Sequence, residues 1–302
     1  MSTFAALPVS MADLAACSEA AFIDGLGSVF EHSAGVARTV LPQRPFASAD
    51  ALHASMMAVL QALPEGELVQ LLCAHPELAG AQARAGAMTA DSHAEQGGLA
   101  LDALGAESAA QWDRLNAAYR ARFGFPFVLC IRRHTRASAL RAFEHRLGNA
   151  RGAELQEALA EIGRISRLRL AARISDHALP GIHGTLGTHV LDLTTGRPAH
   201  GLRVQLFEVA GERRVALVDA VTDQRGMVAM AADAMLPGAP LRIGRYELVF
   251  HVAAYFRAAG APLVDEPFLD VVPVAFGIAE PEVDHHVPLT ITPWAYATYR
   301  GS

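Results

Sequence analysis

The chain of 302 residues is long enough for two ordinary domains. Its composition is 52% hydrophobic and 19% charged, which provides enough apolar side chains for a packed core. A net charge of -6 without a basic stripe argues against nucleic acid as a partner. No apolar run reaches the length of a membrane span and no charged n-region marks a secretory signal, so we expect a cytoplasmic protein with no membrane contact. The cysteines Cys17, Cys73 and Cys130 have no CxxC spacing, which indicates buried free thiols.

Residues 1–173 have the pattern of an all-α helical bundle. Apolar residues recur at spacings of three and four within residues 21–30 and 52–63, and Ser48 and Asp50 stand where the N-cap of the second helix belongs. Further helices are predicted for residues 109–122, 138–147 and 153–173. The interruptions between them are short, as in a bundle.

The character of the chain changes at residues 174–184, a turn-rich linker without helical period. Short β-type runs follow in residues 185–302, and turn signals such as Gln224-Arg225-Gly226 separate them. The runs are residues 188–193, 203–209, 215–222, 245–251, 269–276 and 287–292, with one short helix at 253–259. Strands at this spacing predict a β-sandwich. The fold class is therefore multidomain α and β.

The last stretch of the chain combines several chemically useful side chains. His286 precedes the alternating run 289–292, and the chain then reaches Tyr299-Arg300-Gly301-Ser302. His189 lies on the first predicted strand, on the opposite side from Val190. Taken alone, each histidine is better explained as a surface side chain or a satisfied core side chain.

Taken together, the order and spacing of these residues over 185–302 resemble the 5-hydroxyisourate hydrolases, the transthyretin-related enzymes of urate breakdown. The resemblance implies a transthyretin-like (prealbumin-like) β-sandwich whose sites lie between the subunits of a homotetramer. It also implies that His189 and His286 position and deprotonate a water molecule, for which imidazole has a suitable pKa. The substrate's polar edges would be held by Arg300 with Tyr299, Gly301 and Ser302.

One turn departs from the pattern of this family. The family carries an arginine directly after the glycine of an Asn-x-Asp-Gly-Arg turn, whereas this chain has Gly226-Met227 there. Met227 neither ion-pairs nor donates a hydrogen bond. Arg225 would bind substrate in its place only if the turn is reshaped. Asp284 also stands where the family often has a histidine.

Three segments of the helical half carry candidate site residues, and each has a plain structural explanation. His75-Pro76 fits a helix end, because proline disfavours helix in the residue before it. Ser92 and Glu95 match a capping box, Ser-x-x-Glu. Residues 124–126 fit an interhelical turn. Individually, these structural explanations are favoured.

With Arg169 on the last helix, these segments resemble the 2-oxo-4-hydroxy-4-carboxy-5-ureidoimidazoline (OHCU) decarboxylases over about residues 22–170, including Phe30-Glu31-His32-Ser33. The resemblance implies that His75 is the acid/base, that Glu95 shares its proton handling, and that Arg169 clamps the substrate bidentately. Further substrate contacts would come from Pro76, Ser92, Gln96 and the backbone of Phe127, Val128 and Ile131. No metal or organic cofactor is implied, because the conjugated ring of the substrate delocalises the carbanion left by CO2.

The two resemblances together predict one bifunctional enzyme acting on small-molecule ureides. They also imply a homo-oligomer, with a tetramer formed through the transthyretin-like domain and dimer contacts through the helical domain. Two alternatives stay open. In the first, the sandwich is a catalytically silent binding or oligomerisation module, which Met227 favours. In the second, the chain is a metal-dependent amidohydrolase using some of its 13 histidines, although HxH and HExxH spacings are missing.

Overall fold

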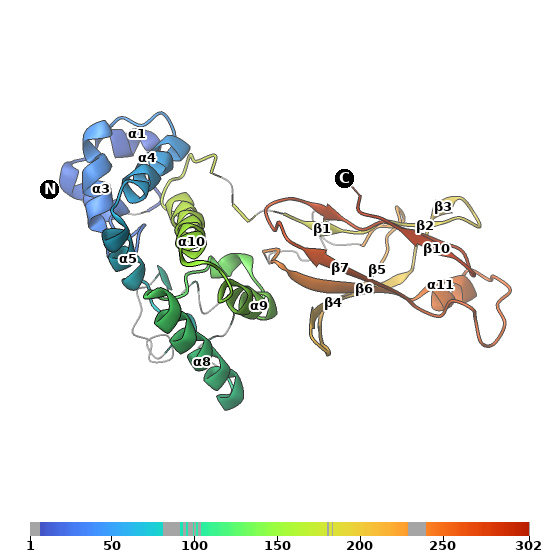
Figure 1. Ribbon diagram of the computed structural model, residues 1–302. Coiled ribbons are helices and arrows are strands. Elements are labelled where there is room, and N and C mark those ends of the chain that lie inside the picture. Colours follow the sequence, from blue (N-terminus) through green and yellow to red (C-terminus); the bar gives the residue numbers. More distant parts are fainter. Residues whose placement is uncertain are drawn as a thin grey trace. The chain divides into compact units, whose positions relative to one another are not determined.

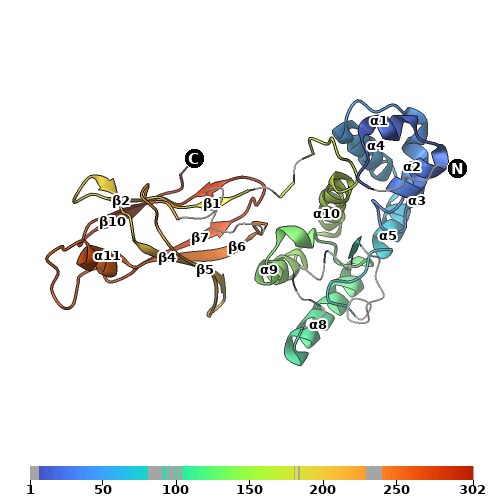
Figure 2. The ribbon, with the colours of Figure 1, turned by 180° about the vertical axis from the view of Figure 1, so that it is seen from behind.

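The structure is a computed structural model, shown in Figures 1 and 2, which describes residues 7–80, 91–92, 95, 99, 101, 104–179, 181–182, 184–228 and 240–301. The chain divides into two compact units, Met1–Arg132 with Ala139–Gly181, and Arg133–Ser138 with Ile182–Ser302. The first unit is helical and the second is built from β-strands. The predicted fold class is therefore confirmed.

Within residues 11–73 and 106–171 the helical elements follow one another with short connections. They are α1 (Met11–Ala16), α2 (Glu19–Leu26), α3 (Ala34–Val40), the 3-10 helix η1 (Leu41–Gln43), α4 (Ala49–Gln61), α5 (Glu65–Cys73), α8 (Ala106–Phe123), the 3-10 helix η2 (Ile131–Arg133), α9 (Arg136–Arg146) and α10 (Arg151–Ala171). In both views α10 lies between α3–α5 and α9 (Figures 1 and 2). This central position lets α10 contact segments from both sides.

Local signals explain where several helices begin and end. The Ser48 hydroxyl accepts the Ala51 N–H at 3.1 Å, so the predicted N-cap of α4 is confirmed. The helix α8 ends at Gly124, whose φ of 81° is the left-handed conformation typical of a residue after a helix. The helix expected over residues 21–30 ends earlier, at Leu26, because glycine at Gly25 and Gly27 weakens it. Apolar side chains that follow are nevertheless buried in the turn.

The core of the helical unit contains a cluster of aromatic rings. Phe127 and Phe143 stack with ring centroids 3.9 Å apart, and Tyr119 packs edge-on against both. The beginning of the expected linker also belongs to this unit, because Ile174 and Leu179 are buried in the same core. The first residues after α10 are thus anchored by packing.

The second unit is a sandwich of two four-stranded sheets, ordered β5-β4-β6-β7 and β10-β9-β2-β3, beside a parallel pair β1-β8. The strands are β1 (Leu186–Gly187), β2 (Val190–Asp192), β3 (Arg197–Pro198), β4 (Arg203–Ala210), β5 (Arg213–Val221), β6 (Gly244–Phe250), β7 (Val272–Ile278), β8 (His285–His286), β9 (Leu289–Ile291) and β10 (Tyr296–Thr298). Each of the six predicted runs overlaps a strand, and the predicted short helix is α11 (Val252–Ala258). Apolar residues on the inner faces form one core.

The end of the chain folds back on itself. Thr292 accepts the N–H groups of Trp294 and Ala295 through its hydroxyl, and β10 then pairs antiparallel with β9. The Gly301 N–H donates to the His286 carbonyl at 2.8 Å. The hairpin of β9 and β10 therefore returns the end of the chain to His286 in β8.

Among the described residues, no helix combines the length and apolar character needed to cross a bilayer. All three cysteines are free, as expected. The expectation that all three are buried is confirmed for Cys130, but Cys17 is only partly buried and Cys73 is exposed at the end of α5.

Candidate active sites

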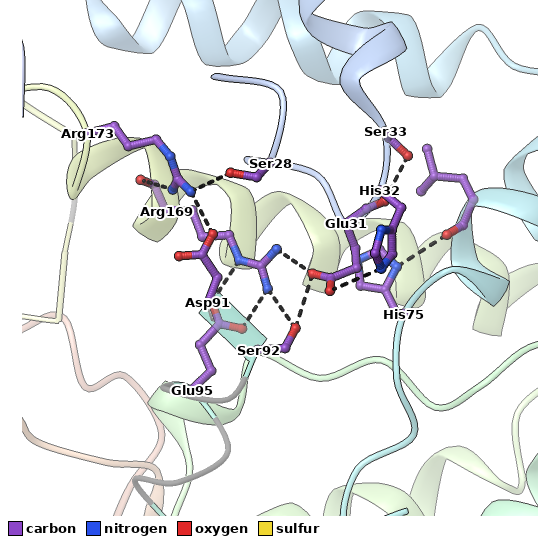
Figure 3. A network of polar contacts seen from close by, with 11 residues as sticks. Ser28, Glu31, His32, Ser33, His75, Asp91, Ser92, Glu95, Arg169 and Arg173 are labelled. Carbon is purple, nitrogen blue, oxygen red and sulfur yellow. Dashed lines mark hydrogen bonds and ion pairs between the residues drawn. The ribbon is translucent and has the colours of Figure 1, made fainter. Parts of the chain in front are cut away.

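Arg169 on α10 is the centre of a buried polar network in the helical unit (Figure 3). Its Nε and Nη2 donate to the two carboxylate oxygens of Glu95, each at 2.9 Å, which is a bidentate pair. Its Nη1 donates to Glu31 Oε2 at 2.8 Å, and its Nη2 also donates to the Ser92 hydroxyl at 3.2 Å. The Arg169 side chain is only 3% exposed.

This arrangement decides between the two explanations of the Ser-x-x-Glu pattern. Ser92 already lies in helical backbone, and its hydroxyl donates to Glu31 at 3.1 Å. Glu95 pairs with the arginine. Both side chains are thus directed at Arg169, and the pattern is not explained by a capping box.

A second arginine, Arg173, holds the same segment one helical turn further on. Its Nη2 donates to Asp91 at 2.6 Å and to the Ser28 hydroxyl at 2.8 Å (Figure 3). Because Asp91 directly precedes Ser92, Arg169 on α10 and Arg173 just beyond its end together fix the position of both site residues that follow.

His75 lies just after α5 and is buried. Its Nδ1 is 3.3 Å from the Leu71 carbonyl, which accepts only, so Nδ1 carries the hydrogen and Nε2 is left as a proton acceptor. Burial lowers the pKa of His75 to about 4, although the negative charge of Glu31 acts in the opposite direction. The imidazole is therefore neutral near pH 7.

These groups line one cavity. Its walls are His75, Pro76, Leu78, Ser92, Glu95, Phe127, Val128, Leu129, Ile131, Ile165 and Arg169. The structure thus brings together all the residues proposed from the sequence for this half, except Gln96, which lies outside the described residues.

The wall formed by residues 127–131 is also held from α10. Glu161 accepts the Cys130 N–H at 2.7 Å. Arg146 donates to the Val128 carbonyl at 2.9 Å and pairs with Glu154, which is 0% exposed. Glu154, Glu161 and Arg169 recur at spacings of seven and eight residues, about two helical turns each, so one face of α10 anchors both the clamp and the wall.

The residue that sequence reasoning missed as a site residue is Glu31. Its side chain is 1% exposed and binds both Arg169 and Ser92. A signal was present, since a carboxylate directly after the buried apolar residues Val29 and Phe30 requires a partner.

The sandwich carries a second group of candidate residues, gathered around two backbone bridges. His189 pairs with Met227, and His286 pairs with Gly301. Val190 is fully buried while His189 is half-buried, as the strand alternation predicts. Burial lowers the pKa of His286, and the nearby His189 lowers it further.

A cavity of about 340 Å³ lies beside the returning tail. His286, Tyr299 and Arg300 line it, with His285, Glu280 and residues 274–277 of β7. Gly301 is close to the His286 ring, because a Cβ there would lie 2.7 Å from His286 Cδ2. The tail and the histidine strand thus meet as the sequence predicts. Ser302 lies outside the described residues.

The turn that departs from the family is held in shape by Asp223. One of its carboxylate oxygens accepts the N–H groups of Arg225 and Met227 at 2.9 and 3.0 Å. The Arg225 side chain is 65% exposed and pairs with Asp223, so Met227 holds the place beside His189. Asp284, where the family often has histidine, accepts hydrogen bonds from the backbone and hydroxyl of Thr185.

Comparison with known proteins agrees with this geometry in both halves. Residues 15–171 match the OHCU decarboxylase family, and residues 186–301 match the HIUase/Transthyretin family. The chain belongs to both families. The 2-oxo-4-hydroxy-4-carboxy-5-ureidoimidazoline decarboxylase of Amia calva is 40% identical over 149 residues, which are 49% of this chain and 85% of that protein.

Relatives of the second half and of the whole chain are also known. The 5-hydroxyisourate hydrolase 2 of Rhizobium meliloti (strain 1021) is 46% identical over 119 residues, which are 39% of this chain and 97% of that protein. The crystal structure of (S)-allantoin synthase matches with a TM-score of 0.53 and 30% identity, covering 98% of this chain and 100% of that one. The order of an OHCU decarboxylase half followed by a hydrolase half is therefore confirmed.

Proposed function

We propose that this chain is a bifunctional enzyme of urate degradation. The sandwich hydrolyses 5-hydroxyisourate to OHCU, and the helical domain decarboxylates OHCU stereoselectively to (S)-allantoin. The observation that carries the proposal is the convergence of neutral His75, Ser92, Glu95 and Arg169 on one cavity, in a chain that matches both families.

In the decarboxylase site, the residues supply positioning and proton transfer. Arg169 is held rigidly by two carboxylates and lines the cavity, where its positive charge attracts the anionic substrate. His75 Nε2 accepts a proton and delivers it to one face of the carbanion. The wall at residues 127–131 offers backbone groups, and Pro76 limits the space. One-sided protonation accounts for a single handedness in the product.

In the sandwich, His189 and His286 form a pair of imidazoles that share the activation of water. The lowered pKa of His286 keeps this ring neutral and able to accept a proton. Arg300 and Tyr299 on the returning tail hold the substrate, and Arg300 stabilises the developing oxyanion. Met227 removes one cation from the family pattern, which favours a slower hydrolase or, in the second candidate function, a silent sandwich beside an active decarboxylase.

We further propose the assembly and the domain limits. Residues 1–173 and 185–302 are the two domains, and residues 174–184 join them, with Ile174 and Leu179 packed into the core of the helical domain. The chain forms a homo-oligomer, a tetramer through the sandwich with dimer contacts through the helical domain, in which a neighbouring subunit completes the hydrolase site.

Fresh 5-hydroxyisourate, made from urate by urate oxidase, tests both activities in the intact protein. Its ultraviolet decay measures the hydrolase, and circular dichroism of the allantoin formed measures the decarboxylase. The variants H286N and H75N are each expected to abolish one signal and preserve the other. Decay at the uncatalysed rate with a dichroic product would establish the silent sandwich, and a racemic product would refute the decarboxylase.

A further inference from the structure

Leu129 lies in the middle of the cavity wall and carries two buried polar groups without a protein partner. The residue is 4% exposed and lines the cavity. Within the described part of the chain, neither its backbone N–H nor its C=O forms a hydrogen bond. Because nearly all buried backbone groups in folded proteins are paired, the partner of these two groups is expected to be the molecule that fills the cavity.

The two peptide units that flank Leu129 are both held from behind the wall. Arg146 donates through Nη1 to the Val128 carbonyl at 2.9 Å, and Glu161 accepts the Cys130 N–H at 2.7 Å. Among the described residues that line the cavity, neither Arg146 nor Glu161 is found. The Val128 carbonyl and the Cys130 N–H therefore point away from the cavity.

Peptide geometry then fixes the direction of both Leu129 groups. In a planar trans peptide, the C=O of one residue and the N–H of the next point in opposite directions. Neither peptide bond of Leu129 is cis. Its N–H therefore points away from Arg146 and its C=O points away from Glu161. Both groups face the cavity side by side, like those of a strand residue that exchanges two hydrogen bonds with its neighbour.

A donor and an acceptor side by side recognise a particular chemistry. A cyclic ureide has an N–H next to a C=O in one planar ring, and these two groups complement a backbone C=O and N–H. A carboxylate offers acceptors only, so it can satisfy one of the two Leu129 groups at most. The wall thus matches a ureide edge better than an acid.

We propose that the backbone N–H and C=O of Leu129 bind the ureide edge of the substrate, and that Glu161 is a positioning residue that aims this C=O by holding Cys130. The proposal rests on the proposed function and deepens it, because it names the part of OHCU that the wall recognises. The Glu161 carboxylate is itself fixed, since it is buried and also pairs with Arg164 on the same helix.

The donor is tested by calorimetric binding of hydantoin, the ring contained in allantoin, to the full chain. Leu129→Pro removes the backbone N–H. Leu129→Val is the matched control, because valine has as many side-chain carbons as proline and keeps the N–H. We expect the Kd of hydantoin to be about five- to tenfold higher in Leu129→Pro than in Leu129→Val, the effect of one hydrogen bond.

The aim of the acceptor is tested with a second probe, hydantoin methylated on both ring nitrogens, which has no N–H for the Leu129 carbonyl. The wild type is expected to prefer hydantoin, and Glu161→Leu is expected to reduce this preference about fivefold or more. Glu161→Gln keeps an acceptor for the Cys130 N–H and is expected to retain the preference.

The matched control for this change is Glu157→Leu, because Glu157 pairs with the same Arg164 from an exposed position of α10. It is expected to leave the binding of both probes unchanged. Glu161→Asp withdraws the acceptor from the Cys130 N–H with a smaller change of polarity, and carries the same test if Glu161→Leu does not fold.

Equal hydantoin binding in Leu129→Pro and Leu129→Val would overturn the proposal. An unchanged preference in the Glu161 variants that lose the acceptor would overturn it as well, as would a wild type that binds both probes equally. A wild type that binds hydantoin but makes no dichroic allantoin would instead refute the proposed function, so the two failures are distinguishable.

Discussion

His53 makes the stability of the helical domain sensitive to acid. Its ring is 4% exposed on α4, and its Nε2 lies 2.9 Å from the Ser166 hydroxyl on α10. Burial is the main cause that lowers the pKa of His53 to about 4, and the positive charge of Arg167 contributes to the same shift. His53→Gln removes the titrating group while it keeps an amide that can bind the serine.

The expected magnitude follows from the two protonation equilibria. Below pH 6.5 the unfolded chain binds a proton that the native ring does not take up until about pH 4, so unfolding becomes more favourable as the pH falls through this window. Above pH 6.5 the titration of His53 does not reduce the free energy of unfolding. The free energy of unfolding falls by about 2 kcal/mol by pH 5 and by about 3 kcal/mol by pH 4, since one pKa unit is about 1.4 kcal/mol. This is a large part of a typical stability of 5–15 kcal/mol.

Urea unfolding followed by the helical circular dichroism signal measures this effect at pH 7.5 and pH 5. The wild-type protein is expected to lose about 2 kcal/mol more than His53→Gln between these two conditions. His145→Gln is the control, because that exposed ring contacts water in both states. Equal pH dependence in the wild type and in His53→Gln would refute the reasoning.

Two substitutions test the supports of the two sites. Gly301→Ala places a Cβ 2.7 Å from the His286 ring, so the tail must move. The ultraviolet decay of 5-hydroxyisourate is then expected to slow at least about tenfold, while the rate of decarboxylation is unchanged. An unchanged decay would show that the tail takes no part in hydrolysis. Arg146→Met leaves Glu154 buried without its cation and is expected to cost about 3–5 kcal/mol in urea unfolding. Arg120→Met breaks an exposed pair and is expected to cost under about 1 kcal/mol; equal losses would contradict the argument.

Local patterns were sufficient for most of the fold. The Ser48 cap and the apolar spacing of α4 predict that helix closely, and period-two runs predict the long strands of the sandwich. Strands of two or three residues, such as β3 and β10, are too short to show a period. The exposure of Cys73 also depends on tertiary packing, which the apolar neighbours of this residue in sequence do not reveal.

The candidate site residues also include some that the sequence reveals and some that only the structure reveals. Motifs with recognisable spacing, such as Ser92 with Glu95, could be found from the sequence, although only the structure shows both converging on Arg169. Glu31 could not be assigned, because its role depends on a contact across 138 positions of chain. The position of Met227 beside His189 likewise results from a bridge between two segments.

The face of α10 that carries Glu154, Glu161 and Arg169 limits which changes in sequence the helix tolerates. A deletion of one residue between Glu161 and Arg169 would turn everything beyond it by about 100° and shift it by about 1.5 Å along the axis. The guanidinium would then leave its two carboxylates while the wall stayed in place. Exposed positions of α10 can change their side chains freely, but its length is fixed. Insertions in related chains, and cut points for exchanging domains between them, therefore belong outside this helix.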